Sequence, residues 1–190
     1  MNRAVFLDRD GTLIAEKNYL SKIEDVAVFS GAVAALSRLQ AAGFKLLIVS
    51  NQSGVGRGYF TMADVERVNR HLSEIFAAGG VRFEKIYVAP EAPGQPSRGR
   101  KPSPQFLFDA RDEFALDLSH SYVIGDKLID LESGWNAGLA KSILVRTGYG
   151  AELERSADAK PLSAIVVDDL QAAADWILRN SGTGVPPVRF

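Results

Sequence analysis

The sequence predicts an α/β fold in which helices cover both faces of a central parallel sheet. Short apolar runs alternate with longer amphipathic segments along most of the 190 residues. Nearly continuous apolar runs are typical of strands that are buried on both faces. Strands that alternate with helices favour parallel pairing through right-handed crossovers. We therefore expect a parallel sheet with the strand order 3-2-1-4-5.

The apolar runs give six candidate strands and the segments between them give five candidate helices. The strands are predicted at residues 4–7, 45–50, 85–89, 121–124, 142–145 and 164–167, and the helices at 31–42, 61–78, 103–114, 130–137 and 170–179. Thr61 followed by Asp64, and Ser103 followed by Pro104, are typical helix starts. Gly43 and Gly79 stand where helices are expected to end.

Composition and charge narrow the classes of function. The net charge of −1 leaves no basic surface for nucleic acid and no polybasic patch for a membrane. The chain has no cysteine, which excludes disulfides and thiolate catalysis and fits the cytoplasm. The strand-like run at residue 4 leaves no room for a signal peptide. We expect a cytoplasmic monomer with one domain at 1–179 and a disordered tail at 180–190.

Polar residues follow the first four predicted strands. They read "DRDGT", "SNQSGVGRG", a loop that ends in "GRKP", and "GDKLID". Because the carboxyl ends of parallel strands meet at one edge of a sheet, these residues predict a single site. Three carboxylates there, of Asp8, Asp10 and Asp126, suit Mg²⁺, which prefers hard oxygen ligands.

Cations and hydrogen-bond donors at the same edge suit a phosphate group. The cations are Arg57, Arg100, Lys101 and Lys127. Ser50, Asn51 and the backbone amides of the glycine-rich segment add donors. Metal, cations and donors together can bind and neutralise a phosphoryl group.

The nucleophile at this site is expected to be a carboxylate. His71 and His120, the two histidines, fall in a predicted helix and ahead of the fourth strand, so a histidine-activated serine is disfavoured. A carboxylate can accept a phosphoryl group, and Asp8 lies nearest the strand end. Asp10 could then protonate the leaving oxygen. The alternation of a strand predicts that Arg9, between them, points away from the chemistry.

These motifs resemble the haloacid dehalogenase (HAD) superfamily of phosphotransferases. "DRDGT", "SN", "RKP" and "GDKLID" occur in the family's order over residues 4–145. The longer stretches "FLDRDGT", "NQSGVGRGYF", "RKPSP" and "VIGDKLID" are most similar to the histidinol-phosphatase-like branch, and within it to sugar-bisphosphate phosphatases. The resemblance implies a three-layer, Rossmann-like domain that hydrolyses a small phosphorylated sugar with Mg²⁺ through an aspartyl-phosphate.

The resemblance also implies a role for each site residue. Asp8 would be nucleophile and metal ligand, and Asp10 the general acid and base with its carbonyl on the metal. Ser50 and Lys101 would stabilise the transferring phosphoryl group. Asp126 would complete the Mg²⁺ site, with Asp130 in the shell behind it or as an auxiliary acid. The residues expected to bind substrate are Glu16, Lys17, Asn18, Tyr19, Asn51, Gln52, Ser53, Arg57, Arg100 and Lys127.

The chain departs from this branch in the loop before "RKP". Many members hold a structural zinc there through three cysteines and a histidine. The matching positions here are Ala89, Glu91, Ser97 and Gly99, which could not form that site. We therefore expect no structural zinc, and a loop ordered by its prolines. With only residues 15–28 and 89–99 available, we also expect no large cap domain and an open site.

Three other activities stay open on the sequence. Within the superfamily these are a histidinol-phosphate phosphatase and a phosphomonoesterase of broad specificity. Outside it, a receiver-like signalling domain also phosphorylates an aspartate at a strand end. Receivers take that aspartate from the third strand, whereas here "APEAPG" completes and follows the third strand.

Overall fold

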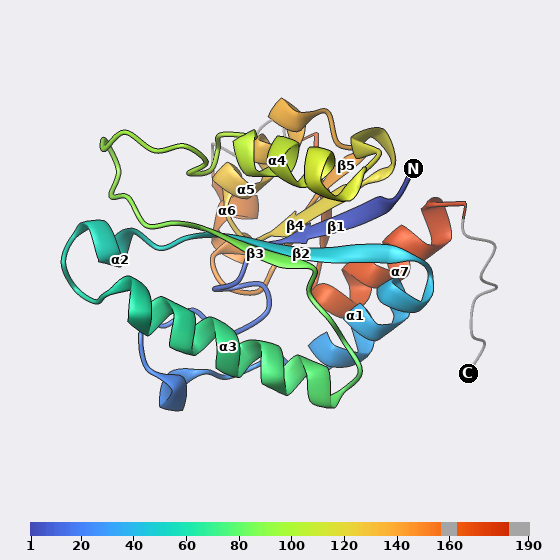
Figure 1. The fold of residues 1–190 in the computed structure, drawn as a ribbon. Coiled ribbons are helices and arrows are strands. Elements are labelled where there is room, and N and C mark those ends of the chain that lie inside the picture. The colour runs from blue at the N-terminus through green and yellow to red at the C-terminus, as the bar shows by residue number, and fades with distance from the viewer. Residues whose placement is uncertain (157–162, 183–190) are drawn as a thin grey trace.

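The computed structural model describes residues 1–156 and 163–182. Within them, six parallel strands form one sheet in the order β3-β2-β1-β4-β5-β6 (Figure 1). The strands are β1 (Arg3–Leu7), β2 (Phe44–Asn51), β3 (Lys85–Ala89), β4 (Tyr122–Gly125), β5 (Lys141–Val145) and β6 (Ile165–Val167). The predicted order 3-2-1-4-5 is confirmed, with the sixth strand added at the edge beside β5.

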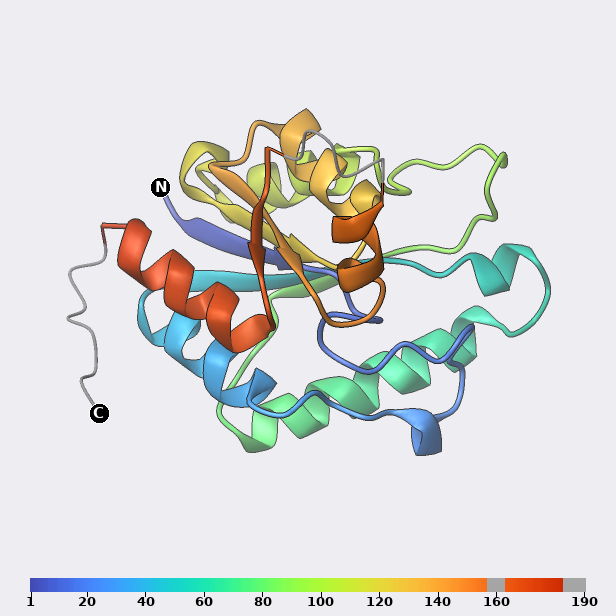
Figure 2. The ribbon, with the colours of Figure 1, turned by 180° about the vertical axis from the view of Figure 1, so that it is seen from behind.

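Helices form a layer on each face of the sheet, as the two opposite views show (Figures 1 and 2). The α-helices are α1 (Ala32–Ala41), α2 (Ser53–Gly56), α3 (Met62–Ala78), α4 (Gln105–Phe114), α5 (Leu128–Ala137), α6 (Gly150–Arg155) and α7 (Leu170–Asn180). Helices α1, α3 and α7 cover one face and α4 and α5 the other. The fold is therefore the expected three-layer α/β arrangement.

The alternation of side chains along β1 divides the core in two. Val5 and Leu7 pack in the cluster that includes residues of α1, α3 and α7. Ala4 and Phe6 pack in the cluster that includes residues of α4 and α5. All four are fully buried. Such a strand, apolar on both faces, has little freedom at its end, which is where the first site acid stands.

Local sequence signals explain where two helices near the site begin. Thr61 and Asp64 form the predicted capping box of α3, with Asp64 N donating to Thr61 Oγ1 at 3.2 Å and Thr61 N donating to Asp64 Oδ2 at 2.7 Å. Helix α5 begins two residues earlier than predicted. Asp130 therefore lies in its first turn, where its Oδ2 accepts from Lys127 N at 2.9 Å.

The two connections that could hold a cap are short. Residues 8–31 carry only the three-residue 3-10 helix η1 (Ile23–Asp25), and residues 90–104 carry no helix or strand. Both are described in full, and neither contains a large cap domain, as expected.

Two sequence expectations concern the chain as a whole. Helix α7 includes Asn180, the first residue of the predicted tail, whereas residues 183–190 lie outside the described residues. The assignment of 1–179 to a single domain stays a prediction. Across the part of the chain that the structure describes, no helix has the length and apolarity needed to cross a membrane.

Candidate active site

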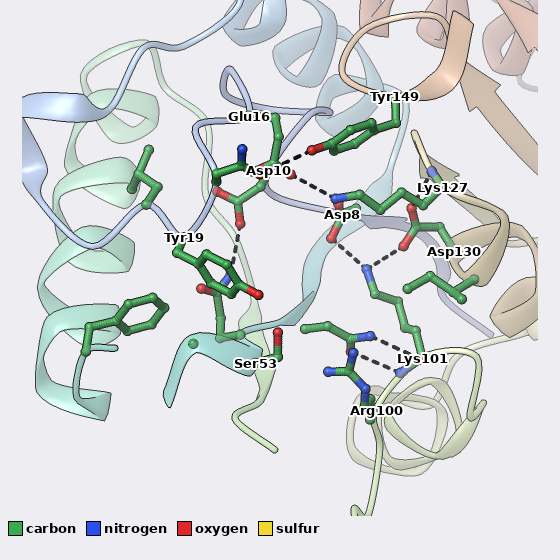
Figure 3. A pocket seen from close by; sticks show the side chains of 17 residues that line it. Asp8, Asp10, Glu16, Tyr19, Ser53, Arg100, Lys101, Lys127, Asp130 and Tyr149 are labelled. Atoms are coloured by element: carbon green, nitrogen blue, oxygen red, sulfur yellow. Dashed lines mark hydrogen bonds and ion pairs between the residues drawn. The ribbon is translucent and has the colours of Figure 1, made fainter. Parts of the chain in front are cut away.

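The carboxyl ends of the strands border a cavity of about 480 Å³ (Figure 3). Twelve of the predicted site residues line it: Asp8, Asp10, Glu16, Asn18, Tyr19, Asn51, Gln52, Ser53, Arg100, Lys101, Lys127 and Asp130. They come from segments far apart in the sequence. The four sequence motifs therefore contribute residues to the lining of one cavity.

The buried Lys101 joins Asp8, at the end of β1, to Asp130 of the "GDKLID" motif. Lys101 Nζ lies 2.6 Å from Asp8 Oδ1 and 2.6 Å from Asp130 Oδ1 (Figure 3). It also donates to the carbonyl oxygen of Val49 at 2.7 Å. Asp8, Lys101 and Asp130 are all at most 6% exposed. The backbone of Lys101 is fixed to β2 by the side chain of Asn51. Asn51 Oδ1 accepts from Lys101 N at 3.0 Å, and Asn51 Nδ2 donates to the carbonyl oxygen of Lys101 at 3.1 Å.

The pKa values of Lys101 and Asp130 are both raised, for different reasons. Burial would lower the pKa of Lys101, but the Asp130 and Asp8 carboxylates raise it above its usual value. Burial raises the pKa of Asp130, and Lys101 opposes that rise. Lys101 therefore stays a cation, available to an anion that enters the cavity.

Asp126 has the properties of a metal ligand. It is fully buried behind the cavity, and its carboxylate lies with those of Asp8 and Asp130 so that one ligand atom of each falls within 4.8 Å of the others. Its Oδ2 accepts from Tyr149 N at 2.9 Å, but its Oδ1 has no hydrogen-bond partner among the residues that the structure describes. Burial, then repulsion by Asp8, raise the pKa of Asp126 to about 8. A buried oxygen without a partner beside a second carboxylate is suited to a hard cation such as Mg²⁺.

Two glycines make room for the Asp126 carboxylate. A Cβ atom added to Gly11 or to Gly148 would lie 2.1 Å from Asp126 Oδ2. Both glycines have positive φ, of +89° and +55°. The "DGT" motif marks Gly11, whereas no motif in the sequence marks Gly148.

Asp10 is held by side chains on two sides. Arg9 Nε donates to Asp10 Oδ2 at 3.0 Å and Arg9 Nη2 donates to Asp10 Oδ1 at 3.1 Å. Gln52 Nε2 donates to Asp10 Oδ2 at 2.9 Å and to Ser50 Oγ at 2.7 Å. Arg9 does not line the cavity, but its guanidinium contacts the Asp10 carboxylate, a contact that the expectation of Arg9 pointing away from the chemistry did not include. Asp10 lies beyond the end of β1, so the alternation of the strand no longer applies there.

The segment after Asp10 forms another wall of the cavity. Glu16 Oε2 accepts from Lys127 Nζ at 2.9 Å, and Asn18 Oδ1 lies 3.3 Å from the hydroxyl of Tyr149 (Figure 3). The Lys127 ammonium lies 4.9 Å from the centre of the Tyr149 ring. Burial would lower the pKa of Lys127, but Asp8, Asp126 and Glu16 raise it. These contacts bring residues 16–18 against the loops that follow β4 and β5.

The loop before Lys101 is closed by its own side chains. Ser97 Oγ donates to Glu91 Oε2 at 2.6 Å and accepts from Arg100 N at 3.2 Å. Arg100 Nη1 donates to the carbonyl oxygen of Glu91 at 2.9 Å. Glu91 and Ser97, two of the positions that match zinc ligands in other members of the branch, are therefore joined by a hydrogen bond. This bond fixes the backbone that carries Arg100 at the cavity.

Four predicted site residues do not line the cavity. Lys17 lies near Asp25, at 3.7 Å, and Arg57 is exposed at the end of α2. Ser50 and Asp126 are buried behind the wall, where Ser50 contacts Gln52 and Asp126 belongs to the acidic cluster.

The sequence did not single out several residues that the structure brings to the cavity. These are Leu20, Gly54, Phe60, Ile129 and Tyr149. Tyr149 could have been predicted, because "RTGYG" follows the fifth strand and so reaches the same edge of the sheet. The apolar residues carry no comparable signal.

Comparisons with known proteins agree with this geometry. The polynucleotide kinase 3 phosphatase family matches residues 3–129, and a HAD-hydrolase-like family matches residues 99–173. The D-glycero-D-manno-heptose-1,7-bisphosphate 7-phosphatase of Chlorobaculum tepidum is 41% identical over 79% of this chain and 81% of its own length. The D-glycero-β-D-manno-heptose-1,7-bisphosphate 7-phosphatase of Escherichia coli K12 is 34% identical over 93% of this chain and 88% of its own length.

A solved structure extends the similarity to three dimensions. The D,D-heptose 1,7-bisphosphate phosphatase from B. bronchiseptica, complexed with magnesium and phosphate, has a TM-score of 0.84 at 28% identity, over 93% of this chain and 98% of that one. The chain belongs to the haloacid dehalogenase superfamily, in the family of the D-glycero-D-manno-heptose-1,7-bisphosphate 7-phosphatases.

Proposed function

We propose that this chain is a magnesium-dependent phosphatase that removes the 7-phosphate from D-glycero-D-manno-heptose 1,7-bisphosphate through an aspartyl-phosphate. The observation that carries the proposal is the Asp8 carboxylate, which is fixed at the end of β1 by the buried Lys101 ammonium and faces the cavity. The choice of substrate follows the names of the two relatives given above.

In the first half-reaction Asp8 is the nucleophile. An Asp8 oxygen forms a bond to phosphorus, the bond from phosphorus to the sugar oxygen breaks, and Asp10 gives its proton to that oxygen. Lys101 neutralises charge on the transferring phosphoryl group. The Ser50 hydroxyl accepts a hydrogen bond from Gln52 and can donate its own proton to that group. Asp130, paired with Lys101, orients the ammonium and so acts through it.

In the second half-reaction water attacks the phosphoryl group on Asp8. Asp10 takes the proton of that water, the bond from phosphorus to the Asp8 oxygen breaks, and phosphate leaves. Asp8 and Asp126, with the carbonyl of Asp10, would hold Mg²⁺, which when bound offsets the negative charge of the carboxylate and phosphate oxygens. The unpartnered Oδ1 of Asp126 supports this assignment.

The remaining lining residues would bind the substrate. Glu16, Asn18, Tyr19, Asn51, Gln52 and Ser53 offer hydrogen bonds to sugar hydroxyls, and Arg100 and Lys127 offer charge to a second phosphate. Lys17 and Arg57 would act from outside the cavity wall. We expect the enzyme to work as a monomer in the cytoplasm.

A panel of phosphate esters tests the substrate assignment. It contains both anomers of the heptose bisphosphate, histidinol phosphate, p-nitrophenyl phosphate and an oligonucleotide with a 3′-phosphate. We expect the highest kcat/KM for one heptose anomer, with release of the 7-phosphate only. A higher kcat/KM for histidinol phosphate or for the oligonucleotide would refute the assignment.

We further infer that the chain needs no structural zinc. The Glu91–Ser97 hydrogen bond supports this inference, because it closes the loop through two side chains, at positions where the zinc site of the branch needs cysteine or histidine ligands. Metal analysis of protein purified without chelators tests it. Stoichiometric zinc in that protein would overturn the inference.

A further inference from the structure

The Arg9 side chain is fully buried between two parts of the molecule. Its Nε and Nη2 atoms donate to the two carboxylate oxygens of Asp10, at 3.0 and 3.1 Å, and its Nη1 donates to Asn69 Oδ1 at 2.9 Å. Asn69 belongs to α3 and is only 7% exposed. Asp10 lines the cavity, but neither Arg9 nor Asn69 is among its lining residues. The guanidinium therefore contacts the acid from the side away from the substrate.

The local backbone does not need this guanidinium for its shape. The chain turns after Asp10 through bonds between main-chain groups. The N–H groups of Leu13 and Ile14 donate to the carbonyl oxygen of Arg9 at 2.9 and 3.2 Å, and Gly11 N donates to the carbonyl oxygen of Ile14 at 2.8 Å. A side chain that merely closed the turn would repeat what these bonds already do.

A buried guanidinium is costly unless its donors are paired. Removing such a charge from water carries a large free-energy penalty, which only well-placed partners offset. Here the partners are one carboxylate and one amide oxygen, each matched to a separate edge of the planar fork. Because Gln52 holds Asp10 Oδ2 from the other side, the Asp10 carboxylate has little rotational freedom.

We propose that Arg9 is a positioning residue for proton transfer by Asp10, and that Asn69 fixes Arg9 for this task. The inference rests on the proposed function, in which Asp10 gives a proton to the leaving oxygen. A general acid must lie within hydrogen-bond reach of the atom that it protonates. Two parallel bonds from a planar fork set the carboxylate angle, whereas the point charge of a lysine would set only its distance.

Two esters separate this role from a structural one. An alkyl phosphate needs a proton on its leaving oxygen, whereas nitrophenolate leaves without one. Since kcat/KM reports the steps up to the first irreversible bond cleavage, it isolates transfer of the phosphoryl group to Asp8. For Arg9→Lys and Asn69→Leu we expect kcat/KM to fall about 10²-fold with the alkyl ester, and less than about threefold with p-nitrophenyl phosphate.

Val68→Ala is the matched control. Val68 is a fully buried neighbour of Asn69 on α3, so its truncation loosens the packing of the helix and removes none of the Arg9 hydrogen bonds given above. We expect Val68→Ala to lower the melting temperature about as much as Arg9→Lys and Asn69→Leu do. The ratio of its kcat/KM values for the two esters should stay that of the unmodified chain. If Arg9→Lys does not fold, Asn69→Leu carries the test, because it keeps the guanidinium and removes only its anchor.

The outcomes distinguish the two proposals. Equal losses with both esters, or no loss with either, would overturn the positioning role and leave the phosphatase intact. Absence of turnover of every ester by the unmodified chain with Mg²⁺ would overturn the proposed function and, with it, this inference.

Discussion

The two sides of the cavity are built in different ways. On the buried side, Asp8, Lys101 and Asp130 are joined by bonds of 2.6 Å and are at most 6% exposed. On the outer side, Tyr19 and Tyr149 are 45% and 39% exposed. Asp8 stands at the end of β1, Asp130 lies in the first turn of α5, and Lys101 is fixed to β2 by the side chain of Asn51, whereas the outer groups stand on loops.

This difference indicates a division of tasks. Groups that take part in bond making need fixed positions in a medium of low dielectric constant, where charge interactions are strong. Groups that recognise a sugar can tolerate more freedom and more water. Substitutions on the buried side should therefore reduce kcat strongly, and substitutions on the outer side should mainly raise KM.

The largest effect is expected for Asp8→Asn on the buried side. An amide cannot form the acyl-phosphate, so turnover should fall at least about 10⁴-fold. The fold should persist, because Lys101 keeps Asp130 and the Val49 carbonyl as partners. Turnover of the preferred ester, mass spectrometry of trapped phosphoprotein and thermal melting measure these outcomes.

The exposed Asp112→Asn, at the other end of the molecule on α4, is the control for Asp8→Asn. It should match the unmodified chain in all three measurements. Turnover retained in Asp8→Asn would rule out Asp8 as nucleophile, and loss of the fold would show that Asp8 has a structural role.

The next effect concerns Asp126 and depends on pH. With its pKa at about 8 in the metal-free fold, Asp126 carries a proton below that pH. Mg²⁺ must then displace this proton, so its apparent affinity should fall as pH decreases from 8 to 6, by up to about tenfold per unit. A series of Mg²⁺ titrations followed by melting temperature measures this. An affinity independent of pH would contradict it.

Asp126→Asn should sharpen the same point. A carboxyl whose folded pKa lies above its unfolded value stabilises the fold only while protonated, so its contribution is lost as pH rises towards 8. In chelator, the variant should melt above the unmodified chain at pH 8.5, with a smaller difference at pH 6. With Mg²⁺ it should show no added stability and about a 10²- to 10³-fold lower kcat/KM. An unchanged response to Mg²⁺ would exclude Asp126 as ligand.

The two sides also differ in how far the sequence predicts them. The strand order and the convergence of Asp8, Lys101 and Asp126 follow from periodicity and from polar residues at strand ends, which are local signals. The contacts of Arg9 with Asn69, and of Glu91 with Ser97, depend on side-chain directions after the chain leaves regular structure. Tyr149 is intermediate, because its strand-end position is visible and its contacts with Lys127 and Asn18 are not.

Gly148→Ala tests a feature that links the two sides. The added Cβ would lie 2.1 Å from Asp126 Oδ2 and 2.7 Å from the Cα of Gly11, so both the carboxylate and the backbone at Gly11 must move. We expect about a tenfold weaker response to Mg²⁺ in melting titrations, in addition to about 1 kcal/mol of backbone strain. Gly138→Ala is the matched control, since its φ is +71° and its Cβ would meet nothing within 4 Å. The control should lose stability alone, and equal Mg²⁺ responses in both variants would contradict the steric account.

The smallest effect is expected on the outer side, for Ser97→Ala. The change removes the Oγ atom that donates to Glu91 and accepts from Arg100 N, so the backbone carrying Arg100 gains freedom. KM for the bisphosphate should rise about three- to fivefold, with kcat nearly unchanged, because one guanidinium is less well placed for binding. Ser103→Ala, whose hydroxyl accepts from Gln105 N at the start of α4, should leave both constants unchanged. A fall in kcat with Ser97→Ala would mean that this loop also positions Lys101. Residues 97–101 would then serve both catalysis and substrate binding, and the two tasks would not be separated between the two sides of the cavity.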